Sequence, residues 1–486
     1  MSTQQAARTR FAPSPTGPMH IGNVRTALYS WLLAKRTGGK FILRLEDTDR
    51  ERYSVEAEEG IKAALRWMGL TWDEGPEVGG PHAPYIQSER LPMYQEAADR
   101  LIAQGNAYRC YCTKERLDDM RAAQQAAKLP PGYDRTCRNL TPEQRAANEA
   151  LGLKSVVRFA MPLEGSVTFE DAVRGEITFD SALLDDFVLL KSDGYPTYQL
   201  AAPFDDLEME ITHIIRGEEW ISSATKNILV SRALGKEPPV YAHLPLILGP
   251  DKKKLSKRNG DAALSDFQAA GYMPEVLLNF LALLGWSEGT DQEIYSLEEL
   301  SQKFSLDGIT RHPAIFDSSK LDWMSGLAIR QMPLAELADR CIPFLQGAGL
   351  VPEPIPADQR PYVEAVLALE QERLKKLGEA PALTEFFFRD ELNWEEKALK
   401  RVQAEGASEI LADVADALDA APEWTLESIE AAVRAVVDRR GVKAGEVIHP
   451  VRAAVTGRTV GPGLFDAIAV LGRDRTTKRL RRNAPA

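Results

Sequence analysis

The chain has little cysteine, with four among its 486 residues. A secreted protein held together by disulfides would carry more, so this composition favours a reducing compartment. Long apolar runs are also lacking, because the most apolar stretch, residues 276–286, is too short to span a bilayer and contains Asn279. The first eleven residues lack the apolar core of a secretory signal. We therefore expect a cytoplasmic protein without a membrane segment.

Two common phosphate-binding signatures are missing as well. The sequence contains neither a GxxxxGK[ST] loop nor a GxGxxG loop, which leaves P-loop, kinase and dinucleotide-binding functions without their usual support. Basic residues do not dominate either, since 59 Lys and Arg against 71 Asp and Glu give a net charge of −12. This balance argues against a general nucleic-acid coat, but it is compatible with RNA binding through local patches.

A strand, a stiff loop and a helix start lie near the beginning of the chain. Residues 9–12 predict a short strand, and the three prolines within residues 13–18 then prevent a helix or a ladder from continuing. Apolar residues recur at helical spacing from His20 onward, which places His20 and Gly22 in the first turn of a helix. Unpaired N–H groups there suit a phosphate, although such a short motif is by itself more typical of a packing turn.

The next strand predicts where a ligand would lie. Residues 41–45 are apolar and end at Glu46. A strand, a helix and a second strand of these lengths imply a right-handed crossover in a parallel sheet. Ligands of such sheets bind beyond the carboxyl ends of the strands, so the proline-rich loop and Glu46 should lie at one edge.

A basic loop far downstream supports the interpretation of the helix start near His20 as a phosphate-binding site. Residues 241–248 predict another strand, and the run from Lys252 to Arg258 follows it between Gly-Pro and Asn-Gly turns. His20 and Lys257 could then converge on one polyphosphate. Phosphoryl and nucleotidyl transfer mainly need donors aimed at charge that develops on phosphate oxygens, so this pair suits such chemistry.

Three cysteines provide part of a zinc site. Cys110, Cys112 and Cys137 have the spacing of three structural ligands. Tyr133 and Asn139 stand where a fourth Cys or His would be expected, and neither is a usual ligand of structural zinc. We therefore commit to no metal ligand, and zinc stays an open alternative.

The two loops resemble the signature motifs of class I aminoacyl-tRNA synthetases. His20-Ile21-Gly22-Asn23 resembles the HIGH motif, and the segment from Lys254 to Arg258 resembles KMSKS. Further segments are similar in order and spacing to bacterial glutamyl-tRNA synthetases over essentially the whole chain: RFAPSPTG, LEDTDRER, LDDF, DGYPTYQLA, THIIRGEEW, HLPLILGPDKKKLSKR, LLNFLALLGW and HPVRAAVTGRTVGPGLFDAIAVLG.

The resemblance implies a ligase that activates L-glutamate with ATP and Mg²⁺ and transfers it to tRNA-Glu, acting as a monomer. It implies a glutamate pocket lined by Arg10, Ala12, Ser14, Glu46, Tyr198 and Arg216. It implies ATP contacts from His20, Gly22, Glu219, Ile247, Lys254, Leu255, Ser256, Lys257 and Arg258. Among these, His20 and Lys257 would stabilise the pentavalent α-phosphate, as catalytic residues. Guanidinium groups suit the carboxylates of glutamate, and Glu46 would hold its α-ammonium group.

The sequence departs from the family pattern at a few positions. Asn23 replaces the last His of HIGH, and Leu255 and Arg258 replace the Met and Ser of KMSKS. Residues 202–204 stand where many members have a Val-Val or Asn-Val run, which leaves one contact of the pocket in question. In relatives with zinc, a His occupies the position of Asn139.

Other functions share parts of this pattern. An enzyme that also charges tRNA-Gln would differ only in a few anticodon contacts. A glutaminyl-tRNA synthetase would have an anticodon region of β-barrels, whereas the pattern of this C-terminal region predicts helices. A truncated enzyme that glutamylates a modified tRNA base would lack the last part of the chain. A silent RNA-binding protein is disfavoured because His20, Glu46, Arg216 and Lys257 are all present.

The predicted fold class is α/β: a Rossmann-like parallel-sheet catalytic domain with an α+β insertion, followed by an all-helical anticodon-binding region. The expected parts are the first half of the catalytic domain (1–106), the insertion (107–192), the second half (193–260), a helical stem-contact domain (261–326) and the helical anticodon-binding region (327–486).

Overall fold

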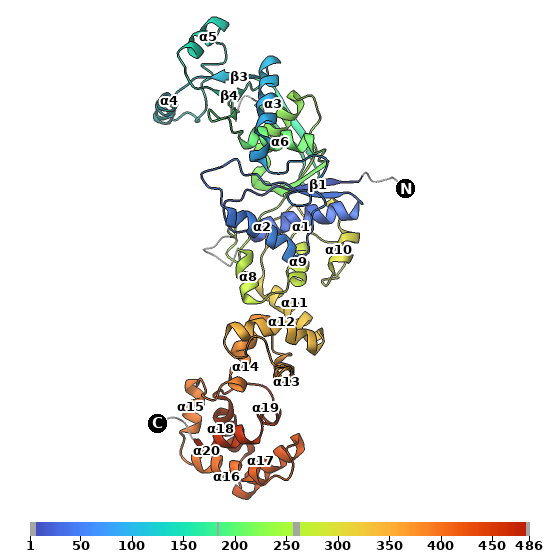
Figure 1. Ribbon diagram of the computed structural model, residues 1–486, viewed down its shortest axis with the longest axis vertical. Coiled ribbons are helices and arrows are strands. Elements are labelled where there is room, and N and C mark those ends of the chain that lie inside the picture. The colour runs from blue at the N-terminus through green and yellow to red at the C-terminus, as the bar shows by residue number, and fades with distance from the viewer. Residues whose placement is uncertain (1–5, 182–183, 256–262, 483–486) are drawn as a thin grey trace. The chain divides into compact units, whose positions relative to one another are not determined.

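The computed structural model describes residues 6–181, 184–255 and 263–482. The chain divides into two compact units, one formed by residues 1–266 and 277–317 and the other by residues 267–276 and 318–486. Figure 1 shows a sheet with its helices in the first unit and only helices in the described part of the second. This confirms the predicted α/β domain followed by a helical region.

The first unit is built on a six-stranded sheet with the order β2-β1-β8-β9-β5-β6. Neighbouring strands are parallel except for the antiparallel hairpin β5–β6. From β1 the chain passes to β2 on one side, whereas β8 and β9 lie on the other. The strand order therefore reverses between β1 and β8, and this is where open α/β sheets bind ligands. The strands are β1 (Arg8–Phe11), β2 (Lys40–Leu43), β5 (Ser166–Asp171), β6 (Gly175–Asp180), β8 (His213–Gly217) and β9 (Val240–Leu244).

Helix α1 connects β1 to β2 and begins where the sequence predicts. Its N-cap is His20, and Val24, Leu28 and Leu32 form part of its buried face. The helix ends at a glycine with a left-handed backbone, Gly38 at φ +65°, a conformation that glycine adopts at little cost. The other helices that follow the sheet are α2 (Val55–Trp67), α3 (Leu91–Ala103), α6 (Tyr198–Glu208) and α7 (Ile221–Ala233), and α1 spans Ile21–Arg36.

The insertion has an antiparallel sheet of its own, with the order β3-β4-β7. Its elements are β3 (Ala107–Cys110), α4 (Lys114–Ala126), α5 (Pro142–Ala150), β4 (Val156–Phe159) and β7 (Val188–Leu190). The hairpin β5–β6 lies within the predicted insertion in chain order, but in space it extends the six-stranded sheet, with Asp171 paired to Tyr241 of β9. Strand β5 buries alternate residues because one of its faces packs into the core of the main sheet.

The segment after the basic loop is mostly helical, as expected, and adds one short strand. Its elements are α8 (Leu264–Ala270), α9 (Pro274–Leu283), α10 (Leu297–Lys303) and β11 (Ala314–Ile315), which pairs with β10 (Ile247–Leu248). A two-residue strand leaves no periodicity to detect, so the sequence did not predict β11. Among the described residues, no helix combines the length and the apolar character needed to cross a membrane.

The second unit packs its helices around a core that consists of aliphatic residues together with Phe386 and Phe387. Within residues 318–482 the described chain forms helices and loops and no strand, which excludes an anticodon region made of β-barrels. The helices are α11 (Ser318–Gln331), α12 (Leu334–Gly347), α13 (Arg360–Glu370), α14 (Ala380–Phe388), α15 (Glu396–Val402), α16 (Ala407–Asp419), α17 (Leu426–Arg440), α18 (Ala444–Thr456), α19 (Leu464–Leu471) and α20 (Arg473–Arg482).

A buried carboxylate in α6 holds two other helical segments, residues 87–90 and α3, against α6. Asp205 is fully buried and accepts hydrogen bonds from Arg90 Nε at 2.8 Å, Gln87 Nε2 at 2.9 Å and the Tyr94 hydroxyl at 2.8 Å. Burial raises the pKa of Asp205, and the nearby Arg44 and Arg90 oppose that shift. Desolvation therefore offsets much of the attraction between Asp205 and Arg90. Removing only one of the two residues would leave the other charge buried without compensation, which destabilises the fold.

We expect Asp205→Ala to lower the free energy of unfolding by about 3–5 kcal/mol, because it leaves the guanidinium of Arg90 buried and unpaired. Denaturant unfolding followed by circular dichroism measures this change. Asp118→Ala is the matched control, since Asp118 pairs with Arg121 on the exposed face of α4 and such pairs contribute little. Equal unfolding midpoints for the two variants would contradict the prediction.

Candidate active site

A cavity of about 710 Å³ lies at the carboxyl ends of β1 and β8, beside the N-terminus of α1. It is lined by residues from the proline-rich loop, the first turns of α1, the ends of β2 and β8, and the strand before the basic loop. The lining residues include Arg10, Ala12, Ser14, His20, Gly22, Glu46, Tyr198, Arg216, Glu219, Ile247, Lys254 and Leu255. The structure thus brings together every predicted site residue that it describes, while Ser256, Lys257 and Arg258 lie outside the described residues.

The start of α1 forms one wall of the cavity. His20 has an extended backbone and its side chain makes no capping hydrogen bond, so the N–H groups at the very start of α1 have no partner within the helix. A Cβ atom on Gly22 would meet no atom of the described residues within 4 Å. Packing against the described residues therefore does not require glycine there, and its open side leaves room for a group that enters the cavity.

The chain beyond the basic loop returns to this wall. Leu264 N–H donates to the Met19 carbonyl at 2.9 Å, and His20 forms an isolated bridge with Ala263. On the near side, Lys254 Nζ lies 3.1 Å from Glu219 Oε1. The described residues on the two sides of the predicted basic loop thus contact two parts of the cavity wall, Glu219 on one side and the start of α1 on the other.

Two charged residues of the lining, Arg10 and Glu46, are held by two buried residues that do not line the cavity, Arg44 and Asp206. Arg10 Nε donates to Asp206 Oδ1 at 3.1 Å. Arg44 is fully buried and donates to the same oxygen at 2.7 Å and to Glu46 Oε1 at 3.0 Å. Burial raises the pKa of Glu46, against the opposing pull of Arg44 and Arg10. A further cation placed in the cavity would therefore favour the ionised form of Glu46.

Arg216 enters the cavity from the end of β8. Its Nε donates to His243 Nε2 at 3.1 Å, one Nη to the Tyr198 hydroxyl at 2.6 Å and the other Nη to the Trp220 carbonyl at 3.1 Å. A guanidinium has five N–H donors, and the described residues use three of them in this way. Two donors remain for a ligand, so the group is held in place and still able to bind an anion.

Several residues that shape this site were not predicted from the sequence. Arg44, Asp206, Asp171 and His243 do not line the cavity but hold the side chains that do. A charged residue inside an apolar segment was the signal that could have found Arg44 and Asp206. His243 also lies inside an apolar segment, but its partners on the neighbouring strands cannot be identified from the sequence.

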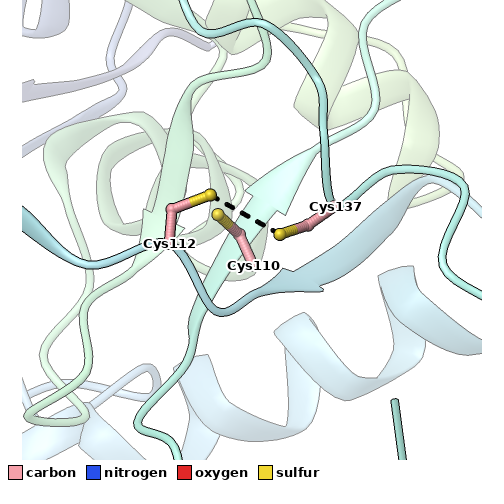
Figure 2. Close-up of side chains that lie close together, drawn as sticks. All are labelled: Cys110, Cys112 and Cys137. Carbon is pink, nitrogen blue, oxygen red and sulfur yellow. Dashed lines mark hydrogen bonds between the residues drawn. The ribbon is translucent and has the colours of Figure 1, made fainter. Parts of the chain in front are cut away.

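The cysteine cluster lies apart from the cavity, in the insertion. Figure 2 shows Cys110, Cys112 and Cys137 with their sulfur atoms turned toward one another. The three Sγ atoms lie within 4.8 Å of one another, and the Tyr133 hydroxyl lies 3.3 Å from Cys110 Sγ and 3.5 Å from Cys112 Sγ. These donors would fit a tetrahedral zinc ion in type and number, with a phenol in place of the usual fourth ligand.

Comparison with known proteins agrees with this geometry. Residues 6–323 match the catalytic domain of class I tRNA synthetases (E and Q), and residues 336–484 match an anticodon binding domain. The glutamate–tRNA ligase of Moorella thermoacetica is 44% identical over 478 residues, covering 98% of each chain. That of Dehalococcoides mccartyi strain BAV1 is 46% identical over 477 residues, covering 97% of this chain and 96% of the relative. The chain belongs to the glutamate–tRNA ligase family.

A solved structure of the same family supports the fold. The crystal structure of a glutamate–tRNA ligase from Elizabethkingia meningosepticum, in complex with its amino acid, is similar with a TM-score of 0.88 and 33% identity, covering 98% of this chain and 99% of that one. The family resemblance expected from the HIGH-like and KMSKS-like segments is thus confirmed. The match of residues 336–484 also argues against a truncated enzyme without an anticodon-binding region.

Proposed function

We propose that this chain activates L-glutamate with ATP to form glutamyl-adenylate, and then transfers the glutamyl group to the terminal adenosine of tRNA-Glu. The observation that carries the proposal is the charge pattern of the cavity. The charged residues that line the cavity include two guanidiniums, Arg10 and Arg216, and the carboxylate of Glu46. Glutamate carries the complementary pattern of two carboxylates and one ammonium group.

In this proposal each end of glutamate has its own partner. Arg216 binds the side-chain carboxylate with the donors that the protein leaves unused. Glu46 accepts from the α-ammonium group, which removes the cost of its buried charge. Tyr198, Ala12 and Ser14 complete the pocket, in which Tyr198 is itself fixed by its hydrogen bond to Arg216.

ATP takes the part of the cavity next to α1, with its Mg²⁺ as the counter-ion of its phosphates. Gly22 lets the nucleotide approach the helix start, and Ile247, Glu219 and the lysine and arginine residues of the basic loop contact it. A carboxylate oxygen of glutamate attacks the α-phosphorus, and pyrophosphate leaves. His20 and Lys257 donate hydrogen bonds to the phosphate oxygens, whose negative charge grows in the transition state. A hydroxyl of the terminal adenosine then attacks the glutamyl carbonyl, and AMP leaves.

The helical unit is proposed to bind the tRNA. Helix α20 has five arginines and one lysine among its ten residues, in a chain that is acidic overall. Such a local basic patch suits a phosphate backbone. We propose that the enzyme acts as a monomer in the cytoplasm, with tRNA-Glu as its macromolecular partner.

Replacing Arg216 tests how the substrate is selected. Arg216→Gln removes the charge that favours a carboxylate over an amide, so kcat/KM for glutamate should fall by about 10²–10³-fold, while activity with glutamine should fall far less. Pyrophosphate exchange with tRNA-Glu present measures both substrates. Arg232→Gln is the control, because Arg232 lies on α7 outside the cavity. Equal losses for both amino acids would refute this role of Arg216.

Replacing His20 tests the transition-state contact. His20→Ala should lower kcat about 10²–10³-fold, as does loss of one donor to a developing anion, with a much smaller change in the KM for ATP. Steady-state exchange kinetics at varied ATP give both constants, and His312→Ala, at an exposed position, is the control. A rise in the KM for ATP that accounts for the whole loss would assign His20 to ground-state binding instead.

We also propose which residues would hold zinc where the protein binds it: Cys110, Cys112, Cys137 and Tyr133. The metal would stabilise the insertion and take no part in the reaction. We expect less than one zinc per chain in the protein as purified, and any zinc that is held should be lost in Cys112→Ser and held more weakly in Tyr133→Phe. Elemental analysis after dialysis measures this, with Cys341→Ser as the control because Cys341 is buried elsewhere, in α12. Unchanged zinc content in Cys112→Ser would rule out this ligand set.

A further inference from the structure

A buried pair of side chains lies directly behind Arg216. Arg216 and His243 are register partners on the parallel strands β8 and β9, so their side chains emerge on the same face. His243 Nδ1 lies 2.6 Å from Asp171 Oδ2, and His243 and Asp171 are both buried. Neither residue lines the cavity. The three residues thus form a chain of hydrogen bonds that leads from the last residue of β5 to the substrate-binding guanidinium.

The hydrogen bonds assign the proton on His243. A guanidinium can only donate, so His243 Nε2 must accept from Arg216 and cannot carry a proton. The ring proton therefore lies on Nδ1 and is donated to Asp171. Burial lowers the pKa of His243, and the charge of Arg216 adds to that effect while Asp171 opposes it. The ring is thus neutral, with a single tautomer set by its two neighbours.

Asp171 is in turn held by the backbone. Its Oδ1 accepts the N–H groups of Val173 at 3.0 Å and Arg174 at 2.9 Å, and its Oδ2 accepts the backbone N–H of His243 at 3.2 Å. These bonds and the one from the imidazole lower the pKa of Asp171 against the opposing effect of burial. The carboxylate is therefore ionised and fixed, and it cannot rotate to offer His243 a donor.

The other groups around the ring do not compete for these bonds. Tyr241 stacks on the imidazole with centroids 5.7 Å apart and an angle of 4° between the planes. Arg174 pairs with Glu218, whose other oxygen accepts the Leu246 N–H. The imidazole of His243 thus packs against Tyr241 with one face, and its two nitrogens bond to Asp171 and Arg216.

We propose that Asp171 and His243 are positioning residues, which hold the Arg216 guanidinium toward the side-chain carboxylate of the substrate through a neutral imidazole protonated at Nδ1. The inference rests on the proposed function of Arg216. It predicts that glutamate binding, and the preference for glutamate over glutamine, depend on whether the side chain at position 243 keeps an acceptor at the place of Nε2. An imidazole as such is not required.

Two substitutions of His243 separate the two bonds. His243→Gln places an amide oxygen near the position of Nε2, so the acceptor for Arg216 is kept. His243→Asn places its amide near Nδ1, so the bond to Asp171 is kept and the acceptor for Arg216 is lost. We expect His243→Asn to raise the KM for glutamate about 10–100-fold, the range typical of losing an outer partner of a binding group. His243→Gln should stay within a few-fold of the parent, and both should keep the parent KM for ATP.

The experiment is pyrophosphate exchange by the full-length chain with tRNA-Glu, at varied glutamate, glutamine and ATP, alongside thermal unfolding of each variant. A selective loss of glutamate over glutamine in His243→Asn, with rescue in His243→Gln, supports the proposal. Equal effects of the two variants, or parent-like kinetics in His243→Asn, overturn it. Absence of glutamate-dependent exchange in the parent would instead refute the proposed function.

A spectroscopic measurement keeps the inference testable if a variant does not fold. Long-range ¹H–¹⁵N spectra of histidine-labelled parent protein should show one ring protonated at Nδ1 and bare at Nε2, which is identified by its loss in His243→Gln. Asp171→Asn should reverse that tautomer, because the oxygen of the introduced amide stays with the two backbone N–H groups and its nitrogen faces the ring. An Nε2-protonated or doubly protonated His243 in the parent protein would refute the assignment.

Discussion

One buried carboxylate, Asp206, determines where two arginines of the site can lie. Its Oδ1 accepts from Arg10 at 3.1 Å and from Arg44 at 2.7 Å, and the second bond also directs Arg44 toward Glu46. These two guanidiniums hold the pKa of Asp206 below its usual range in spite of burial. Without this anion, Arg10 would lose the carboxylate that fixes its Nε, and the buried charges of Arg10 and Arg44 would be less fully compensated.

The same arrangement leaves the cavity prepared for its ligand. Arg10 is tied at Nε, and Arg216 is tied at three of its five donors, so their remaining donors are directed by the protein before a ligand arrives. Fixing these long side chains in advance reduces the ordering cost of binding. The sheet contributes the location, because the reversal of strand order between β1 and β8 leaves a crevice at their carboxyl ends.

The parts of this fold that follow from local pattern could be predicted. The prolines, the helical spacing after His20 and the apolar strands gave β1, α1, β2 and the position of the cavity close to where the structure has them. The hairpin β5–β6 could not be assigned to the main sheet, since its partner β9 lies much further along the chain and periodicity does not specify a partner. In the same way, the apolar segment around Asp205 and Asp206 does not reveal their arginine partners, which lie far away in the chain.

The position of Asp171 at the end of β5 explains how a hairpin from the insertion can serve the site. A strand end leaves backbone N–H groups without ladder partners, and Asp171 collects those of Val173 and Arg174. Its remaining oxygen then faces His243 on the next strand, and His243 faces Arg216 on the strand after that. The order of the strands β5, β9 and β8 in the sheet is therefore also the order in which Asp171, His243 and Arg216 are hydrogen-bonded. The pairing of β5 with β9 brings Asp171 within reach of His243, so the same pairing that extends the sheet also orients the arginine at the cavity.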